Sequence, residues 1–362
     1  MTKFGVEDSP VFELVHESSI EALNDADVSM DDIDAVVISN SEVFGMERHT
    51  SAIVSSIFQK KMPIINTTAV CCGGGAALWT ANKLNYNNVL VIGVEKVLSD
   101  NSMNITEEIM TAAERVYEQA EGLNFPAENA LVAQQYMAMH YVTNDDLALV
   151  AYKNHDNAVN NPKARFYNKK VSLEDIKNSP IVASPLRLFD CSLSVNGAAA
   201  AVLTKKKTDI EISASSFFVD RLAAFERDDM TSSESARLAA SEAYKQAGIS
   251  PDEIDIAEVH DSFTPAELIS YEDLGFCKKG QAKELIRNNM TGLNGKLPVN
   301  TSGGLKAKGH PISATGISQI YELVKQMLNE AGKNQIDNIK YALAHNVGGA
   351  GSAAAVHILR KW

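Results

Sequence analysis

The feature that most constrains the fold of this chain is an internal repeat. Residues 21–34 (EALNDADVSMDDID) are matched by residues 242–255 (EAYKQAGISPDEID). Both copies have the pattern of a helix end, a turn and the entry into a strand. The sequence therefore predicts a chain built as two similar halves, near 1–205 and 206–362.

Short apolar or alanine-rich segments predict the strands of each half. They are 35–38, 88–93, 197–203, 256–259, 340–344 and 351–356. Alanine-rich strands need close packing on both faces, and strands that alternate with helices indicate βαβ units, so the fold class is α/β. Residues 96–185 match neither copy of the repeat. Their polar, helical pattern predicts an excursion from the first half.

Composition narrows the function. A net charge of -13 over 362 residues argues against nucleic acid as the main ligand. We see no run of 18 apolar residues and no secretory leader pattern, so we expect neither a membrane span nor export. The cysteines form no CxxC pair and no metal-binding spacing, which indicates free thiols in a reducing, cytoplasmic compartment and no metal site. They are Cys71, Cys72, Cys191 and Cys277.

The first chemical motif places a cysteine before a glycine-rich turn. Cys71 and Cys72 precede three glycines, and Ala76 onward has a helical pattern. At a helix N-terminus the dipole and free amides stabilise a thiolate, lower its pKa and can face an oxyanion. The alternative is that the glycines allow close helix packing beside buried, inert thiols. The local sequence does not separate these two interpretations.

Three further motifs carry imidazoles. His310 is held between glycine and proline before an expected helix, which suits a base or an oxyanion donor. His260 and Ser262 lie at the end of one expected strand, and His345 follows another, in a segment with Gly348 and Gly349. Ligands in α/β proteins bind beyond the carboxyl ends of strands. One thiol, several imidazoles and glycine-rich turns suit nucleophilic acyl transfer.

Together and in this order, the four motifs resemble the thiolase superfamily over essentially the whole chain. They are most similar to the sterol-carrier-protein-type thiolases and the archaeal acetyl-CoA acetyltransferases. The matching stretches are Cys71 to Gly74, His260 to Phe263, Gly309 to Pro311 and His345 to Gly351, with support from Lys153 to His155, Asn161 to Pro162 and Asp190 to Leu203.

The resemblance implies a duplicated five-layered αβαβα fold whose excursion covers the active site and helps to bind coenzyme A. It implies a homodimer or homotetramer that acts on acyl-CoA thioesters without a cofactor. Archaeal relatives also associate with a hydroxymethylglutaryl-CoA synthase and a small bridging protein.

The resemblance also assigns roles at the site. Cys71 would accept the acyl group, and Cys72 stands where the family has alanine. His310 would activate Cys71, while His260 and His310 polarise the thioester oxygen of the second substrate. The amides of Cys71 and of the Gly348–Gly349 turn would form the other oxyanion hole.

Two departures from the family pattern affect this interpretation. Members that make carbon–carbon bonds carry a second cysteine as acid/base, whereas this chain has Ser262 in one candidate place, and His345 and Asn346 in the other. The segment at Met1 corresponds to one that usually follows a first strand, so that strand is expected to be missing. Three functions therefore stay open: an acetoacetyl-CoA thiolase, an acyltransferase or hydrolase without a Claisen step, and a non-catalytic scaffold.

Overall fold

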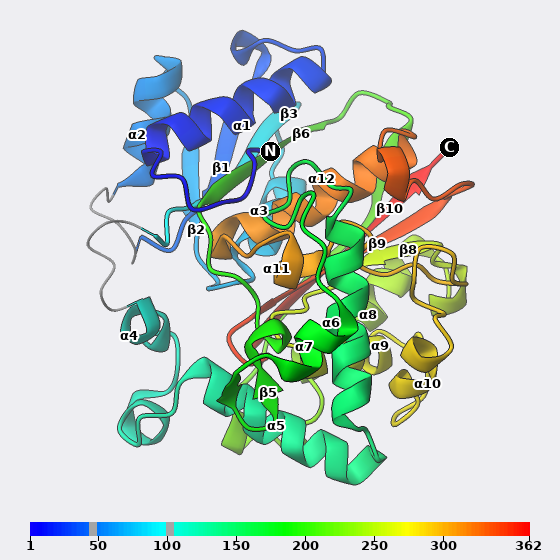
Figure 1. The fold of residues 1–362 in the computed structure, drawn as a ribbon. Coiled ribbons are helices and arrows are strands. Elements are labelled where there is room, and N and C mark those ends of the chain that lie inside the picture. Colours follow the sequence, from blue (N-terminus) through cyan, green and yellow to red (C-terminus); the bar gives the residue numbers. More distant parts are fainter. Residues whose placement is uncertain (43–48, 99–104) are drawn as a thin grey trace.

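The fold is built on two four-stranded sheets, one in each half of the chain. The computed structural model describes residues 1–42, 49–98 and 105–362. The first sheet has the order β2-β1-β3-β6 and the second has the order β7-β10-β9-β8 (Figure 1). Their strands are β1 (Ala35–Ser39), β2 (Ile64–Thr67), β3 (Asn88–Glu95), β6 (Gly197–Thr204), β7 (Ile210–Val219), β8 (Ile256–Glu258), β9 (Tyr341–Gly348) and β10 (Ala353–Lys361).

The sheets and helices stack in five layers, as expected for the thiolase fold. Helices α3 (Gly73–Lys83) and α12 (Thr315–Met327) lie between the two sheets and contact strands of both. Helix α1 (Val11–Asp25) covers the outer face of the first sheet, and α8 (Glu234–Ala247) covers that of the second. Strands β1 and β3 pair in parallel and are buried along their length, which explains their continuous apolar sequence.

The internal repeat has a structural cause. In each copy a short 3₁₀ helix leads into a strand, and a serine before it forms a capping box with an acidic residue. The aspartate that ends each copy then accepts two backbone N–H groups at the start of a neighbouring strand. Asp34 binds the amides of Asn87 and Asn88, and Asp255 binds those of Lys340 and Tyr341.

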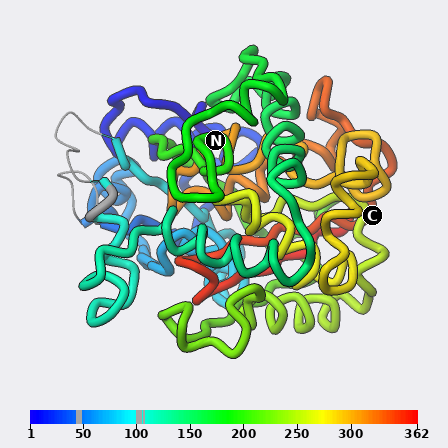
Figure 2. The backbone as a smooth tube through the Cα atoms, turned by 60° about the horizontal axis from the view of Figure 1, so that its bottom comes forward, coloured from blue at the N-terminus to red at the C-terminus, as the bar shows by residue number. Residues whose placement is uncertain are grey.

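The described residues of the excursion between β3 and β6 are mainly helical, as predicted, and pack on the second half of the chain (Figures 1 and 2). Its helix α6 contacts α9, α10 and α11, and α5 contacts α9. The elements involved are α5 (Phe125–His140), α6 (Asn144–Ala158), α9 (Thr264–Asp273), α10 (Ala282–Arg287) and α11 (Gly304–Ala307). The excursion therefore contacts α11, which lies shortly before His310, and α9, which begins shortly after His260 and Ser262.

The remaining elements are short. They are α2 (Thr50–Phe58), α4 (Ile105–Met110), a π-helix (Arg115–Gln119), α7 (Leu173–Asn178), β4 (Ile181–Ala183), β5 (Leu186–Arg187) and 3₁₀ helices at Met30–Asp32, Leu188–Asp190, Ala224–Glu226, Pro251–Glu253, Ile312–Ala314 and Gly332–Asn334. Within the described ranges, no helix has the length and apolar character needed to cross a membrane.

The N-terminal residues lie beside β6, at the edge that corresponds to the position of β7 in the second half. Gly5 pairs antiparallel with Asn196, and the Thr2 amide donates to the Ala198 carbonyl. This edge carries an isolated bridge, and the described residues form no regular strand there.

Candidate active site

Cys71 lies in the turn between β2 and α3, directly before Cys72, which is the N-cap of the helix. Its neighbour Val70 has a φ of +49°, a left-handed conformation that is costly for a β-branched residue and recurs at functional turns. The Cys71 side chain is half-buried against Val97 and Ile312. The turn thus holds one thiol at the edge of the apolar core in a fixed backbone geometry.

The glycines after this turn are helical, so α3 begins at Gly73 and not at Ala76 as predicted. The reason is packing between the layers. A Cβ at Gly74 would lie 2.9 Å from the Gly316 amide nitrogen, and one at Gly75 would lie 2.6 Å from the Ala355 Cβ. Both interpretations of the motif therefore hold in part: the glycines allow close packing, and a cysteine stands at the helix N-terminus.

Cys72 and Cys71 differ in their surroundings. Cys72 is fully buried, and its thiol donates to the Asn346 carbonyl oxygen, 3.1 Å away. The Cys71 sulfur faces the Gly349 backbone N–H, which acts to lower the pKa of the thiol. A Cβ at the preceding Gly348 would lie 2.6 Å from the Ala69 carbonyl oxygen, so this strand end fits against the Cys71 turn only without a side chain. Of the two thiols, Cys71 is the one that faces a backbone donor from the last glycine segment.

The structure corrects the expected effect on the Cys71 pKa. Burial raises the pKa of the Cys71 thiol to about 12, and it outweighs the effect of the Gly349 backbone N–H, which lowers it. The buried carboxyl of Glu95 adds to the increase. The thiol of the resting protein is therefore protonated near neutral pH, and a nearby base has to remove its proton.

A raised thiol pKa predicts the pH dependence of alkylation. Iodoacetamide reacts with the thiolate, so the rate of Cys71 alkylation should keep rising between pH 7 and pH 10 and show no plateau near the ordinary thiol pKa of about 8.5. The measurement is the loss of unmodified Cys71 peptide by mass spectrometry, with circular dichroism as a check that the protein stays folded. A plateau below pH 8 would show that the helix N-terminus dominates over burial.

His260 and His310 form a close pair. Their ring centroids lie 5.2 Å apart at an interplanar angle of 85°. His260 is the second residue after β8, and the His310 backbone N–H donates to the Leu193 carbonyl, 2.8 Å away. Burial lowers the pKa of His310 to about 3 and the pKa of His260 well below its ordinary value. Both imidazoles are therefore neutral at physiological pH.

Asn346 joins Cys71 to this pair. Its Oδ1 accepts the Gly75 N–H at 3.1 Å, which fixes the orientation of the amide. Its Nδ2 donates to the Cys71 carbonyl oxygen at 3.0 Å and to His260 Nδ1 at 3.2 Å. An amide NH₂ cannot accept a hydrogen bond, so His260 carries its proton on Nε2 and can donate from there.

The opposite tautomer follows for His310. Its Nδ1 lies 2.6 Å from Thr315 Oγ1, and the Thr315 hydroxyl donates to the Pro311 carbonyl at 3.4 Å. With the hydroxyl proton used in this way, Thr315 accepts from Nδ1–H, and the Nε2 lone pair is left free. The pair then offers one donor, at His260, and one base, at His310. Within the described ranges, no hydrogen bond joins the Cys71 thiol to either ring.

His345 lies inside β9, opposite Val356 of β10, and not after a strand as predicted. Strand β9 extends three residues past His345 because its pairing with β10 continues to Gly348. Burial lowers the pKa of His345 to about 3, and neither ring nitrogen has a hydrogen-bond partner among the residues that the structure describes. His345, His260, Ser262 and Gly349 line one small cavity of about 60 Å³. Of the candidates for the second acid/base, Ser262 and His345 thus share a cavity, whereas Cys191 and Cys277, the alternative cysteines, are not among the residues that line it.

Sequence reasoning did not single out Glu95 or give Asn346 a role. Glu95 ends β3, is fully buried and accepts hydrogen bonds from the Ser313 and Ser41 hydroxyls at 2.7 and 2.9 Å. Burial raises its pKa. The signal that could have identified Glu95 is a charged residue at the end of an otherwise apolar strand.

Comparisons with known proteins agree with the fold. The family models described as "Thiolase, N-terminal domain" and "Thiolase C-terminal domain-like" match residues 1–207 and 217–361. An acetyl-CoA acetyltransferase of Methanothermobacter thermautotrophicus is 37% identical, over 99% of this chain and 97% of its own. Sterol carrier protein 2 of Bos taurus is 32% identical, over 97% of this chain and 69% of its own.

Solved structures show the same fold at lower identity. An Ltp2–ChsH2(DUF35) aldolase superposes with a TM-score of 0.83 at 24% identity, covering 99% of this chain and 95% of that one. Human mitochondrial 3-ketoacyl-CoA thiolase superposes with a TM-score of 0.71 at 17% identity, over 99% and 96% of the two chains. With both family models matched along nearly the whole sequence, this chain belongs to the thiolase family.

Proposed function

We propose that this protein is an acetyl-CoA C-acetyltransferase that transfers an acyl group between coenzyme A thioesters through a thioester on Cys71. One observation carries the proposal: the Cys71 sulfur faces the Gly349 amide while Asn346 links its backbone to two neutral histidines. The archaeal relatives named acetyl-CoA acetyltransferase support the choice of acetyl-CoA. Incubation with acetyl-CoA and with acetoacetyl-CoA plus coenzyme A, following thioester loss in both directions, tests it.

In the first step the Cys71 sulfur attacks the thioester carbonyl, and its proton passes to His310 Nε2. The Cys71 and Gly349 amides stabilise the oxyanion that forms. The carbon–sulfur bond to coenzyme A then breaks, and the departing thiolate takes the proton back from His310. The products are acyl-Cys71 and free coenzyme A, and both histidines return to their starting state.

In the second step a base removes a proton from the methyl carbon of a second acetyl-CoA. His260 Nε2–H donates to the developing enolate oxygen. The enolate carbon attacks acyl-Cys71, and the carbon–sulfur bond to Cys71 breaks. The Cys71 thiolate then takes up the proton that the base removed from the methyl carbon. In this chain Ser262 occupies one position where the family carries the cysteine that serves as this base.

We therefore expect Cys71 acylation to be near normal and the Claisen step to be slow. Ser262→Cys should speed condensation, because a thiol titrates near pH 8.5 and a serine hydroxyl does not titrate usefully. The measurements are the acetoacetyl-CoA formation rate and the acyl-enzyme burst for both proteins. Ser270→Cys is the matched control, since Ser270 lines the same cavity but bonds the Ala266 carbonyl, and it should bring no gain.

If the starting protein condenses acetyl-CoA at ordinary thiolase rates and Ser262→Cys brings no gain, the serine is no handicap. His345 lines the same cavity, and neither of its ring nitrogens has a hydrogen-bond partner among residues 1–42, 49–98 and 105–362, so it is then the base to test first. A burst of acyl-enzyme followed only by hydrolysis favours the second candidate function, an acyltransferase or hydrolase without a Claisen step. This candidate is favoured by Ser262, because it stands where family members that make carbon–carbon bonds carry a second cysteine.

The acting form is proposed to be a homo-oligomer. Strand β2 is an edge of the first sheet, pairs only with β1 among the described strands, and leaves Asn66 exposed. An unpaired edge that runs directly into the Cys71 turn suits pairing with a second copy. Sedimentation velocity should show a dimer or tetramer at assay concentrations; a fully active monomer would contradict this. Association with a hydroxymethylglutaryl-CoA synthase and a bridging protein stays a prediction, tested by co-purification.

A further inference from the structure

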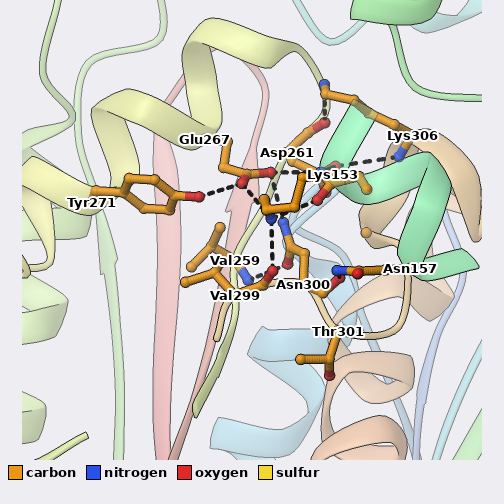
Figure 3. Close-up of polar contacts among 12 residues, drawn as sticks. Lys153, Asn157, Val259, Asp261, Glu267, Tyr271, Val299, Asn300, Thr301 and Lys306 are labelled. Carbon is orange, nitrogen blue, oxygen red and sulfur yellow. Dashed lines mark hydrogen bonds and ion pairs between the residues drawn. The ribbon is translucent and has the colours of Figure 1, made fainter. Parts of the chain in front are cut away.

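A buried network of charged and amide side chains includes Asp261, the residue that follows His260 in sequence, and Lys306 of α11 (Figure 3). Lys153, from helix α6 of the excursion, lies 2.8 Å from the Glu267 carboxylate of α9. Its ammonium also donates to Asn154 Oδ1 and to the Val299 carbonyl, both at 2.7 Å. Lys153 and Glu267 are 6% and 0% exposed, so the pair is closed to solvent.

Asn154 joins this ion pair to the motif that carries His260. Its Nδ2 donates to Glu267 Oε2 at 2.6 Å and to Asp261 Oδ2 at 2.7 Å. Asn300 Nδ2 and the Tyr271 hydroxyl donate to the same Glu267 carboxylate. Two buried carboxylates from different elements are thus held together by one amide group.

Asp261 extends the network to the segment that leads to His310. Its Oδ1 accepts the Leu305 N–H at 2.6 Å, at the start of α11. In return, the Lys306 ammonium donates to the Asp261 carbonyl at 2.8 Å and to the Asp190 carbonyl at 3.1 Å. Asp261 follows His260 in sequence, and α11 ends three residues before His310. One residue therefore fixes the chain on both sides of the histidine pair.

We propose that the network of Lys153, Asn154, Glu267, Asp261 and Lys306 is a positioning device that sets the separation of His260 and His310 and ties it to the excursion. The inference rests on the proposed function for the roles of the two histidines. It goes beyond that function because none of these five side chains touches the reacting groups. Their effect reaches the site through the backbone of 260–261 and of 304–310, and through the charge of Lys306, which contributes to the lowered pKa of His260.

Stability alone is a poor explanation for this arrangement. Replacing a buried ion pair by apolar residues of similar size is often neutral or stabilising, because removing the charges from water costs about as much as their attraction returns. A fully satisfied buried network instead selects one geometry. A small displacement of a catalytic group can reduce the rate by about 10²-fold. A network that fixes the positions of the two histidines would therefore protect the reaction rate.

The test compares two asparagines on one helix. Asn154→Ala removes the amide that joins the two carboxylates, without changing the number of charges. Asn157→Ala is the matched control: Asn157 is also buried on α6, and its Nδ2 donates to the Asn300 carbonyl at 3.0 Å, outside the ion pairs. The readouts are kcat, KM and the rate of Cys71 alkylation by iodoacetamide.

For Asn154→Ala we expect kcat and the alkylation rate to fall by about 10- to 100-fold, with KM changed by less than about 3-fold. Asn157→Ala should leave all three within about 3-fold. Equal losses in the two variants, or unchanged kcat and alkylation in Asn154→Ala, would overturn the proposal. If Asn154→Ala does not fold, the double variant Lys153→Met/Glu267→Gln, which removes one charge of each sign, replaces it with the same expected split.

Alkylation separates this proposal from the proposed function. It needs a positioned base beside Cys71 but no acyl transfer. If the parent protein shows no acyl transfer, the proposed function is wrong. The alkylation rates of Asn154→Ala and Asn157→Ala would still decide whether the network positions the histidines.

Discussion

Cys71→Ala is expected to lower acyl transfer by about 10⁴-fold or more, because loss of a covalent nucleophile removes the whole chemical route. The structure supports the proposal that Cys71, rather than its neighbour, has this role. Of the two neighbouring thiols, the Cys71 sulfur is the one that faces the Gly349 amide, which is proposed to stabilise the oxyanion of a tetrahedral intermediate. The measurement is incubation with acetyl-CoA or acetoacetyl-CoA, digestion, and identification of the acylated peptide by mass spectrometry.

Cys72→Ala is the control, since this thiol differs from Cys71 by one position and is fully buried. Its hydrogen bond to the Asn346 carbonyl is a modest loss, so acylation should stay within about 10-fold of the parent protein. Acyl label on Cys72, together with undiminished labelling of Cys71→Ala, would show that the nucleophile has been assigned to the wrong cysteine.

Much of the architecture could be predicted from the sequence because it is encoded locally. Strand β1 follows the first copy of the repeat and β8 the second, as expected, since the capping box before each strand joins residues only three positions apart in sequence. The alanine-rich segments are strands β6 and β10, packed closely between layers as their small side chains require. Element ends were less well predicted: α3 starts earlier and β9 ends later.

Those errors have one physical origin. The glycines before Ala76 have low helix propensity, but contacts with α12 and β10 make the helical conformation there the one that fits. His345 looked like a loop residue because glycines follow it, yet pairing with β10 extends the strand through it. Tertiary contacts override local preference at both places, and neither contact is visible in the local sequence.

The chemical state of the site was also beyond local reasoning. A cysteine at a helix N-terminus suggests a low pKa, but burial between the layers has the larger effect and raises it. The role of Asn346, and the meeting of Lys153 with Glu267, depend on segments more than 100 residues apart. The motifs indicate which residues matter, whereas only the fold shows which atoms face one another.

A protonated nucleophile gives His310 a large expected effect. With the Cys71 pKa near 12, the resting thiolate is a very small fraction of the thiol at neutral pH, so attack requires proton transfer to a base. The free Nε2 of His310 is the base that the hydrogen bonds leave available. His310→Ala is therefore expected to slow Cys71 acylation by ~10²–10⁴, the usual contribution of a general base, and to reduce iodoacetamide alkylation near neutral pH.

Thr315→Val separates loss of the base from loss of its orientation. It keeps the imidazole and nearly the same side-chain volume, but removes the oxygen that accepts from Nδ1–H. The ring can then adopt the other tautomer, so acylation should fall, by less than in His310→Ala, and the loss should be partly recovered in Thr315→Ser. If His310→Ala leaves both acylation and alkylation unchanged, His310 is a structural residue of the loop. The proton of Cys71 must then leave through another group, and Glu95, a buried carboxyl that acts on the pKa of Cys71, is the first to test.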